Sequence, residues 1–205
     1  MNLLFLFFTG IAIGISGAMI PGPLTIFTIS ATLQTNKYAG LKIIFGHVIL
    51  EFFFTAGVLF GLQRFTGSAD FLRTSAIIGS IALSIMGLLL LLNAPKMRLS
   101  DIKGGPQFNK SLFIGGIIFS VISPGFLIWW ATVVTPSIIK ALLSGILGVI
   151  ILTIGRWTAD VGWHWSLSWG VSKGRMYLSD RAYQNVLRAF AVILILLSLR
   201  FYTQI

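Results

Sequence analysis

The sequence predicts an all-α integral membrane protein with six transmembrane helices. Of its 205 residues 56% are apolar and 10% are charged, and the mean hydropathy is +0.94, whereas about 25% of the residues in a soluble domain are charged. The apolar stretches also reach the ~20 residues that a helix needs to cross the hydrocarbon layer. They do not alternate between apolar and polar residues, so a β-barrel is not expected.

This composition excludes several classes of protein. The 15 basic and five acidic residues are too few to cover a soluble fold, so the chain is not a soluble enzyme, a disordered segment or a free nucleic-acid binder. We expect the net charge of +10 to reflect orientation in the membrane and contact with anionic lipids. Because the chain has no cysteine, disulfides and cysteine metal sites are excluded, and no cofactor is expected.

Six apolar stretches are long enough to span the membrane. They are residues 3–33, 41–62, 75–93, 112–134, 138–169 and 182–202. The first and the fifth are longer than one crossing requires, so each must tilt, break or project from the bilayer.

Basic residues fix the expected orientation. Nine lie in the loops after the first, third and fifth stretches: Lys37, Lys42, Lys96, Arg98, Lys103, Lys110, Lys173, Arg175 and Arg181. Three lie in the opposite loops: Arg64, Arg73 and Lys140. The side with more basic residues is therefore predicted to be cytoplasmic. We expect the protein to lie in the cell membrane with both termini on the outer face. No basic residue precedes the first apolar run, which argues against a cleaved signal peptide.

Two Pro-Gly interruptions predict an internal repeat. The first stretch contains Ile20-Pro21-Gly22-Pro23, and the fourth contains Ser123-Pro124-Gly125-Phe126. Pro124 follows Pro21 by 103 residues, about half of the chain. We therefore expect one membrane domain of two three-helix repeats, residues 1–93 and 112–205, joined by a cytoplasmic linker at 94–111. Because each half crosses the membrane three times, the second must be inverted relative to the first.

The interruptions are also the predicted substrate site. Proline frees backbone polar groups inside the apolar layer, and these groups need partners. In secondary transporters, paired interrupted helices of inverted repeats often bind the substrate, and the positive end of a half-helix can hold a carboxylate. The predicted substrate-binding residues are Pro21, Gly22, Pro23, Ser123, Pro124 and Gly125. The alternative is that each interruption is only a structural kink.

The sequence resembles the lysine exporter (LysE/RhtB) translocator family. The resemblance rests on the run Gly17-Ala18-Met19-Ile20-Pro21-Gly22-Pro23, on Gly40 and Gly46 in the second span, and on the six-span layout. It implies export of amino acids or similar small solutes, coupled to an ion gradient and usually to protons. Two departures bear on the substrate: this chain has Ser123-Pro124 where relatives often have Asn-Pro, and His47 where an acidic residue often follows the glycine.

Ionisable side chains inside the second span are candidates for ion coupling. His47, Glu51 and Thr55 are spaced four apart and therefore share one helical face. A charged group at membrane depth costs about 2.5–3.5 kcal/mol, so a functional role is expected by default. Glu51 is the leading candidate for proton coupling, with His47 beside it. The alternatives are that Glu51 only makes a structural hydrogen bond, and that His47 is a histidine near the cytoplasmic end whose hydrogen bonds are all made within the protein.

The fifth span repeats this pattern with Arg156, Asp160 and His164. Asp160 is the second candidate for proton coupling, and Arg156 completes the predicted ion-coupling set with Glu51 and His47. If Arg156 instead holds Asp160 ionised in a salt bridge, Asp160 would better bind a substrate ammonium group. Several tryptophans lie nearby, and tryptophans are common at the membrane interface. A third possibility is therefore that His164 lies in the headgroup layer and that the aliphatic part of the Arg156 side chain carries its guanidinium to water.

The leading functional hypothesis is a proton-coupled exporter of amino acids or similar zwitterions that works by alternating access. Its expected partners are a small-molecule substrate, a proton or another coupling ion, and membrane lipids. The sequence leaves open whether the chain forms a homodimer. The alternative is a divalent-cation exporter whose site combines His47, Glu51, Asp160 and His164, although no resident metal is expected. An intramembrane enzyme is a weaker alternative, because the sequence has no convincing nucleophile and base motif.

Overall fold

The computed structural model describes residues 2–19, 22–62, 69–96, 108–174 and 179–202, and these residues contain helices and no strand. The longer helices are α1 (Leu3–Ala18), α2 (Pro23–Gln34), α3 (Ala39–Gly57), α5 (Ala69–Asn93), α6 (Phe108–Val121), α8 (Thr135–Leu142), α9 (Gly145–Gly174) and α10 (Asp180–Tyr202). Shorter elements connect them: the π-helical turns η1 (Val58–Leu62) and η3 (Trp130–Val134), the 3₁₀ turn η2 (Ala94–Lys96) and the helix α7 (Pro124–Trp129).

The described helices make the chain a multi-pass membrane protein. Four of them are long and apolar enough to cross a membrane: Ala39–Gly61, Gly125–Leu142, Gly145–Gly174 and Asp180–Arg200. The bent pair α1 and α2 makes a fifth if it counts as one span. The structure therefore supports an all-α membrane fold with four or five such spans, whereas the number six and the inverted repeat stay predictions.

The first predicted span is interrupted where the sequence indicates. Helix α1 ends at Ala18, α2 begins at Pro23, and the two axes differ by 76°. Pro23 stands at the first helical position of α2 after the N-cap residue Gly22, a position that suits proline because its missing N–H would have no partner there. Pro21 lies outside the described residues.

The fourth predicted span is interrupted as well. Helix α6 ends at Val121, and α7 begins at Pro124. Ser123 is the N-cap of α7, and its Oγ accepts a hydrogen bond of 3.4 Å from the backbone N–H of Phe126. From Gly125 the chain then runs as one membrane-length helical segment to Leu142.

The predicted fifth span is wrong at its start. Ile138 lies in α8, which continues the fourth span, and a tight turn separates α8 from α9. The turn is closed by a 2.9 Å hydrogen bond from the N–H of Ser144 to the carbonyl of Ala141, and Gly145 has φ +74°. Glycine adopts this left-handed conformation without steric cost. Leu142 and Leu143 keep the stretch apolar through the turn, so hydropathy alone does not reveal it.

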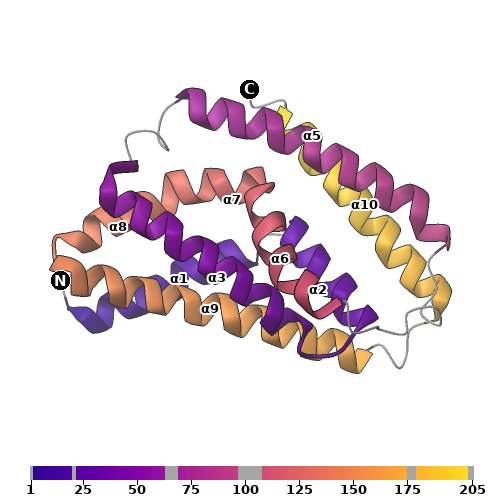
Figure 1. Cartoon of the computed structure of the whole chain (residues 1–205), viewed down its shortest axis with the longest axis horizontal. Coiled ribbons are helices and arrows are strands. Elements are labelled where there is room, and N and C mark those ends of the chain that lie inside the picture. The colour runs from indigo at the N-terminus through magenta and orange to yellow at the C-terminus, as the bar shows by residue number, and fades with distance from the viewer. Residues whose placement is uncertain (1, 20–21, 63–68, 97–107, 175–178, 203–205) are drawn as a thin grey trace.

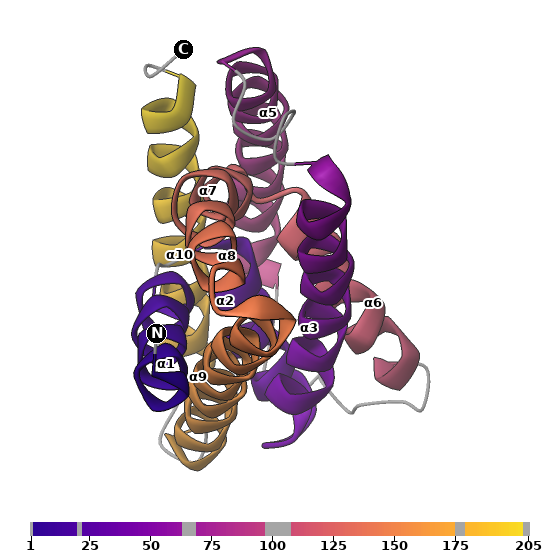
Figure 2. The same ribbon diagram turned by 90° about the vertical axis from the view of Figure 1, so that its left-hand side faces the viewer.

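Each half-helix that precedes an interruption packs against a helix from the other half of the chain. Helix α1 lies along α9, and α6 lies along α3; α5 and α10 form a third pair, which is prominent in both views (Figures 1 and 2). Glycines allow the first two pairs to approach closely: Gly10 and Gly14 face the α9 backbone, and Gly116 faces the α3 backbone. These pairs bring α1, α3, α6 and α9 together around the middle of the molecule.

Candidate functional site

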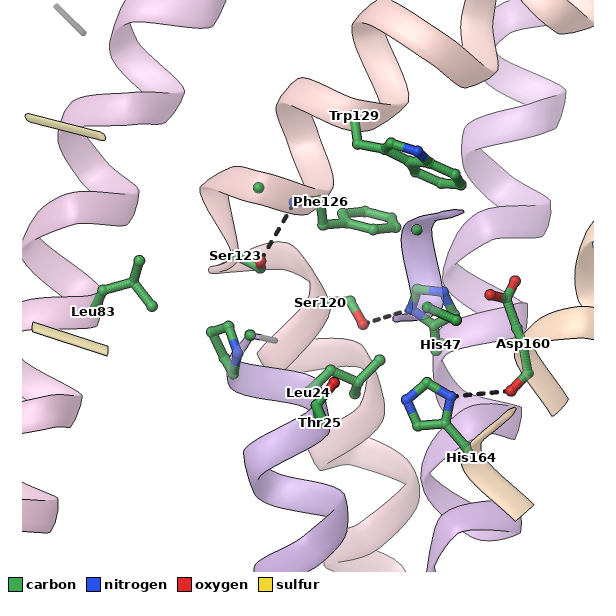
Figure 3. Close-up of a pocket in the computed structure, with 15 residues that line it drawn as sticks. Leu24, Thr25, His47, Leu83, Ser120, Ser123, Phe126, Trp129, Asp160 and His164 are labelled. Carbon is green, nitrogen blue, oxygen red and sulfur yellow. Dashed lines mark hydrogen bonds between the residues drawn. The ribbon is translucent and has the colours of Figure 1, made fainter. Parts of the chain in front are cut away.

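A cavity lies where the two interruptions meet (Figure 3). It holds about 740 Å³ of space not filled by protein atoms, part of which is open to the outside. Gly22 and Pro23 line it from the first interruption, and Ser123 and Gly125 line it from the second. The remaining lining residues are Gly17, Ala18, Leu24, Thr25, His47, Leu83, Ser120, Phe126, Trp129, Asp160 and His164. Of the predicted substrate-binding residues, Pro21 lies outside the described part of the chain, and Pro124 is described by its backbone only.

The N-terminus of α2 presents backbone donors beside this cavity. No side chain caps it through Gly22, and Pro23 carries no N–H. Among the described residues, the backbone bonds of this helix begin with the one from the N–H of Ile26 to the carbonyl of Gly22 at 3.0 Å, so the N–H groups of Leu24 and Thr25 have no partner within α2 itself. These two residues line the cavity, where their N–H groups and the positive end of the helix favour an anion.

Asp160 is the acidic residue of the cavity wall. Its side chain is 3% exposed, and its Oδ2 atom has no hydrogen-bond partner among the described residues. His164, one turn further along α9, places Nδ1 3.0 Å from the carbonyl oxygen of Asp160. A carbonyl only accepts, so Nδ1 carries a proton and donates it. His164 Nε2 also lacks a partner in the described part of the chain, so a carboxyl oxygen and an imidazole nitrogen of the cavity-lining residues could both bind a ligand.

Glu51 lies behind the cavity and is fully buried. Its Oε1 atom accepts hydrogen bonds from Arg156 Nη1 and, at 3.1 Å, from Trp130 Nε1. Arg156 also stacks over the Trp130 ring, with 4.9 Å between the guanidinium carbon and the ring centroid. Glu51 is not among the described residues that line the cavity. The sequence analysis offered two interpretations of Arg156: a salt bridge with Asp160, or a side chain that reaches water. Both are wrong, because Arg156 is buried and pairs with Glu51.

His47 links the cavity to Glu51. Its Nδ1 lies 2.7 Å from Ser120 Oγ, and Ser120 donates its one hydroxyl proton to the carbonyl of Gly116 at 2.6 Å. Because that proton is already used, His47 Nδ1 must be the donor to Ser120. His47 Nε2 then faces Glu51 Oε1 at 3.5 Å. This second nitrogen is where His47 gains or loses a proton.

His47, Glu51 and Asp160 form one compact cluster, since each offers an atom within 4.8 Å of the atoms of the other two. One imidazole and two carboxylates are a donor set that Zn²⁺ or Mn²⁺ accepts. However, the Arg156 guanidinium already binds Glu51 Oε1, and its charge would repel a divalent cation there. The cluster does not include His164, which the sequence interpretation assigned to the same metal site.

Sequence reasoning missed three residues that shape this region: Ser120, Trp130 and Leu83. Ser120 orients His47, Trp130 donates to Glu51, and Leu83 forms part of the cavity wall. Ser120 and Trp130 each bind a residue of a different helix and Leu83 lines the cavity from α5, so no spacing along one helix reveals them. Only Ser120 carries a sequence signal, because it lies one turn before the Ser123-Pro124 interruption.

A sequence model described as LysE type translocator matches residues 15–205. No curated protein and no solved structure matches the chain significantly.

Proposed function

Because the chain belongs to the LysE type translocator family, as the sequence predicted, we propose that it is a secondary transporter that exports an amino acid or similar zwitterion in exchange for protons. The family is one of transporters and implies a small-molecule substrate. The identity of the zwitterion, the proton and the export direction are parts of the proposal, as is a place in the cell membrane with both termini outside.

The packing of the helices supports two inverted halves. Exchange of the halves converts the α1–α9 pair into the α6–α3 pair and maps the α5–α10 pair onto itself. If the halves are inverted repeats, exchanging their conformations would give a second arrangement open to the other side, which is the requirement for alternating access. The cavity at the two interruptions would be the site that opens alternately.

The charge balance of the buried cluster is the observation that carries the coupling mechanism. Glu51 and Asp160 are two acids, and Arg156, the guanidinium that the described part of the chain places beside them, is bound to Glu51. One negative charge, on Asp160, is therefore left to be balanced from elsewhere. An unbalanced charge in a low-dielectric site costs several kcal/mol, so the outstanding positive charge must come from a proton or from the substrate.

The exchange of a proton for the substrate follows from the single unbalanced negative charge on Asp160. A proton on His47 Nε2 or on Asp160 neutralises the cluster, and so does the ammonium group of a bound zwitterion. Both together would leave an excess positive charge, so each displaces the other. A protein that changes its open side only when the cluster is neutral would exchange one proton for one substrate ammonium. The sequence ranked Glu51 ahead of Asp160 for this role, and the cavity geometry favours Asp160.

The carboxylate of the zwitterion would bind at the N-terminus of α2. Leu24 and Thr25 present N–H groups there that have no partner within the helix. Asp160 and this helix end are complementary to the ammonium and carboxylate of one amino acid. Gly22, Pro23, Ser123 and Gly125 would bring the backbone close to the substrate.

The test is transport into inside-out vesicles that contain the full chain. If the lumen is made acidic, uptake of a labelled amino-acid mixture should rise, and nigericin should abolish the rise by collapsing the pH gradient. Asp160→Asn should remove the uptake, and Asp70→Asn, at an exposed position on α5, is the matched control. Uptake that ignores the pH gradient would reject proton exchange, and the absence of uptake for all solutes would reject the transporter.

A divalent-cation exporter is the second candidate, because the donor atoms of His47, Glu51 and Asp160 lie within 4.8 Å of one another. Cells that express the protein would then tolerate Mn²⁺ or Zn²⁺ better, and His47→Gln or Asp160→Asn would remove the tolerance. In this mechanism Arg156 would have to leave Glu51 before the metal binds. The guanidinium contact therefore favours the zwitterion.

A further inference from the structure

We infer that the transported zwitterion has an uncharged, mainly apolar side chain, as leucine does, and that lysine, arginine, aspartate and glutamate are poor substrates. This inference rests on the proposed function and narrows its substrate. It follows from the number and the placement of charged groups around the cavity.

The cavity offers one acid. Among the described residues that line it, Asp160 is the acidic one, and its unpartnered oxygen is committed to the α-ammonium group. Glu51, the next acid, is buried behind the wall, and Arg156 and Trp130 bind it. A basic side chain of the substrate would bring a second cation with no second carboxylate to balance its charge, and the neutral acceptor His164 Nε2 would replace only part of the hydration that it loses.

The described residues of the cavity offer few donors to an anion. At α2 these are the N–H groups of Leu24 and Thr25; at α7 the N-cap Ser123 occupies the N–H of Phe126 and leaves that of Gly125. No lysine or arginine is among the described residues of the wall. The carboxylate of an acidic side chain would therefore compete with the α-carboxylate for the same donors.

The rest of the wall is apolar. Ala18, Leu24, Phe126 and Trp129 contribute to it, and Leu83 of α5 closes it opposite Asp160 (Figure 3). A substrate whose ammonium group lies at Asp160 would direct its side chain toward this apolar part. Aliphatic side chains gain free energy from such burial, and charged ones lose it.

The first experiment measures binding of labelled amino acids to the purified full-length protein, by equilibrium competition. Leucine should bind at least tenfold more tightly than lysine or glutamate. Two fragments test the charged groups separately: 3-methylbutylamine lacks the carboxylate and 4-methylpentanoate lacks the ammonium, and both should bind more weakly than leucine. Asp160→Asn should reduce leucine binding at least tenfold and should change the binding of 4-methylpentanoate much less.

A second experiment changes the specificity. Leu83→Asp adds an acid across from Asp160, so it should raise the ratio of lysine to leucine affinity at least tenfold, whereas the similar but uncharged Leu83→Asn should not. Leu83 is buried, so the yield and thermal stability of both variants must be measured. If Leu83→Asp does not fold, the comparison of substrates on the unaltered protein still decides.

The outcomes separate this inference from the function on which it rests. Preference for lysine or glutamate over leucine would overturn the inference and leave amino-acid transport standing. If no amino acid binds and none is transported into vesicles, the proposed function fails, and the inference fails with it. Leucine binding at least tenfold tighter than that of the charged amino acids, with pH-driven uptake, supports both.

Discussion

Arg156 pairs with Glu51, a residue 105 positions earlier in the chain, although Asp160 lies one turn away on its own helix. This choice of partner divides the two buried acids of the site. Glu51 is held by three helices through Arg156 of α9, Trp130 of η3 and its own α3. Asp160 is left at the cavity wall without an ion pair among the described residues; each carboxylate keeps one unpartnered oxygen, Glu51 Oε2 behind the wall and Asp160 Oδ2 in the residue that lines the cavity. The roles of the two carboxylates follow from this division.

The Arg156–Glu51 pair should matter for stability more than for substrate selection. Arg156→Gln leaves Glu51 buried without its cation and should cost about 3–5 kcal/mol, whereas Glu51→Gln leaves Asp160 to balance Arg156 and should cost less. The double variant removes both charges and should lose less than the sum, by about 0.5–3 kcal/mol. Thermal unfolding of the purified protein checks this, with the exposed Arg73→Gln as control. Strictly additive losses would show that the two side chains do not depend on each other.

Asp160→Asn should reduce transport of the zwitterion more than tenfold while leaving protein abundance and thermal stability close to those of the unaltered chain. The reason is that Asp160 makes no side-chain ion pair within the described structure that the amide would break, whereas the amide cannot balance an ammonium charge. Initial rates of uptake into vesicles measure the effect. Normal transport by this variant would exclude Asp160 from substrate binding.

His47→Gln should separate exchange from proton coupling. The glutamine amide can still hydrogen-bond near Ser120, but it cannot take up a proton at the position of Nε2. We therefore expect exchange of labelled for unlabelled substrate to persist within about threefold, since Asp160 still binds the ammonium, while accumulation driven by an acidic lumen falls severalfold. If the pH gradient still drives full accumulation, the proton is carried elsewhere, and Asp160 is then the remaining candidate in the cavity.

Gly116→Val should destabilise the packing of α6 against α3. A Cβ at Gly116 would approach the His47 backbone nitrogen to 3.2 Å and the Ile43 backbone more closely still, so the two helices must separate, at a cost of about 1–3 kcal/mol. Gly162→Val on α9 is the control, because a Cβ there has open space. Apparent melting temperatures report the difference. An equal effect at both positions would show that the close approach is not important.

The sequence predicted the helical membrane fold, the family and both interruptions, because these depend on local signals: hydropathy over ~20 residues and proline inside an apolar run. It did not predict the turn before Gly145, since Leu142 and Leu143 keep the hydropathy high through it. A positive φ at one glycine has no signature in a run that contains many glycines.

The candidate site was predicted in part. The spacing of His47 with Glu51, and of Arg156 with Asp160, singled out side chains that lie close together inside the bundle, and their role in ion coupling stays a prediction. It could not say which basic group pairs with which acid, because that depends on how α3 and α9 are rotated against each other. The same limit applies to Ser120, Trp130 and Leu83, which reach the site from other helices.

The reciprocal contact of α1 with α9 and of α6 with α3 has a consequence for biogenesis. When the ribosome has delivered only the first half of the protein, α1 lacks the surface that its glycines fit, and α3 lacks the partner of Gly46. Neither half can then complete its native contacts alone. Arg156 is synthesised after Glu51, so the Glu51 carboxylate is inserted into the bilayer before the guanidinium that pairs with it is available.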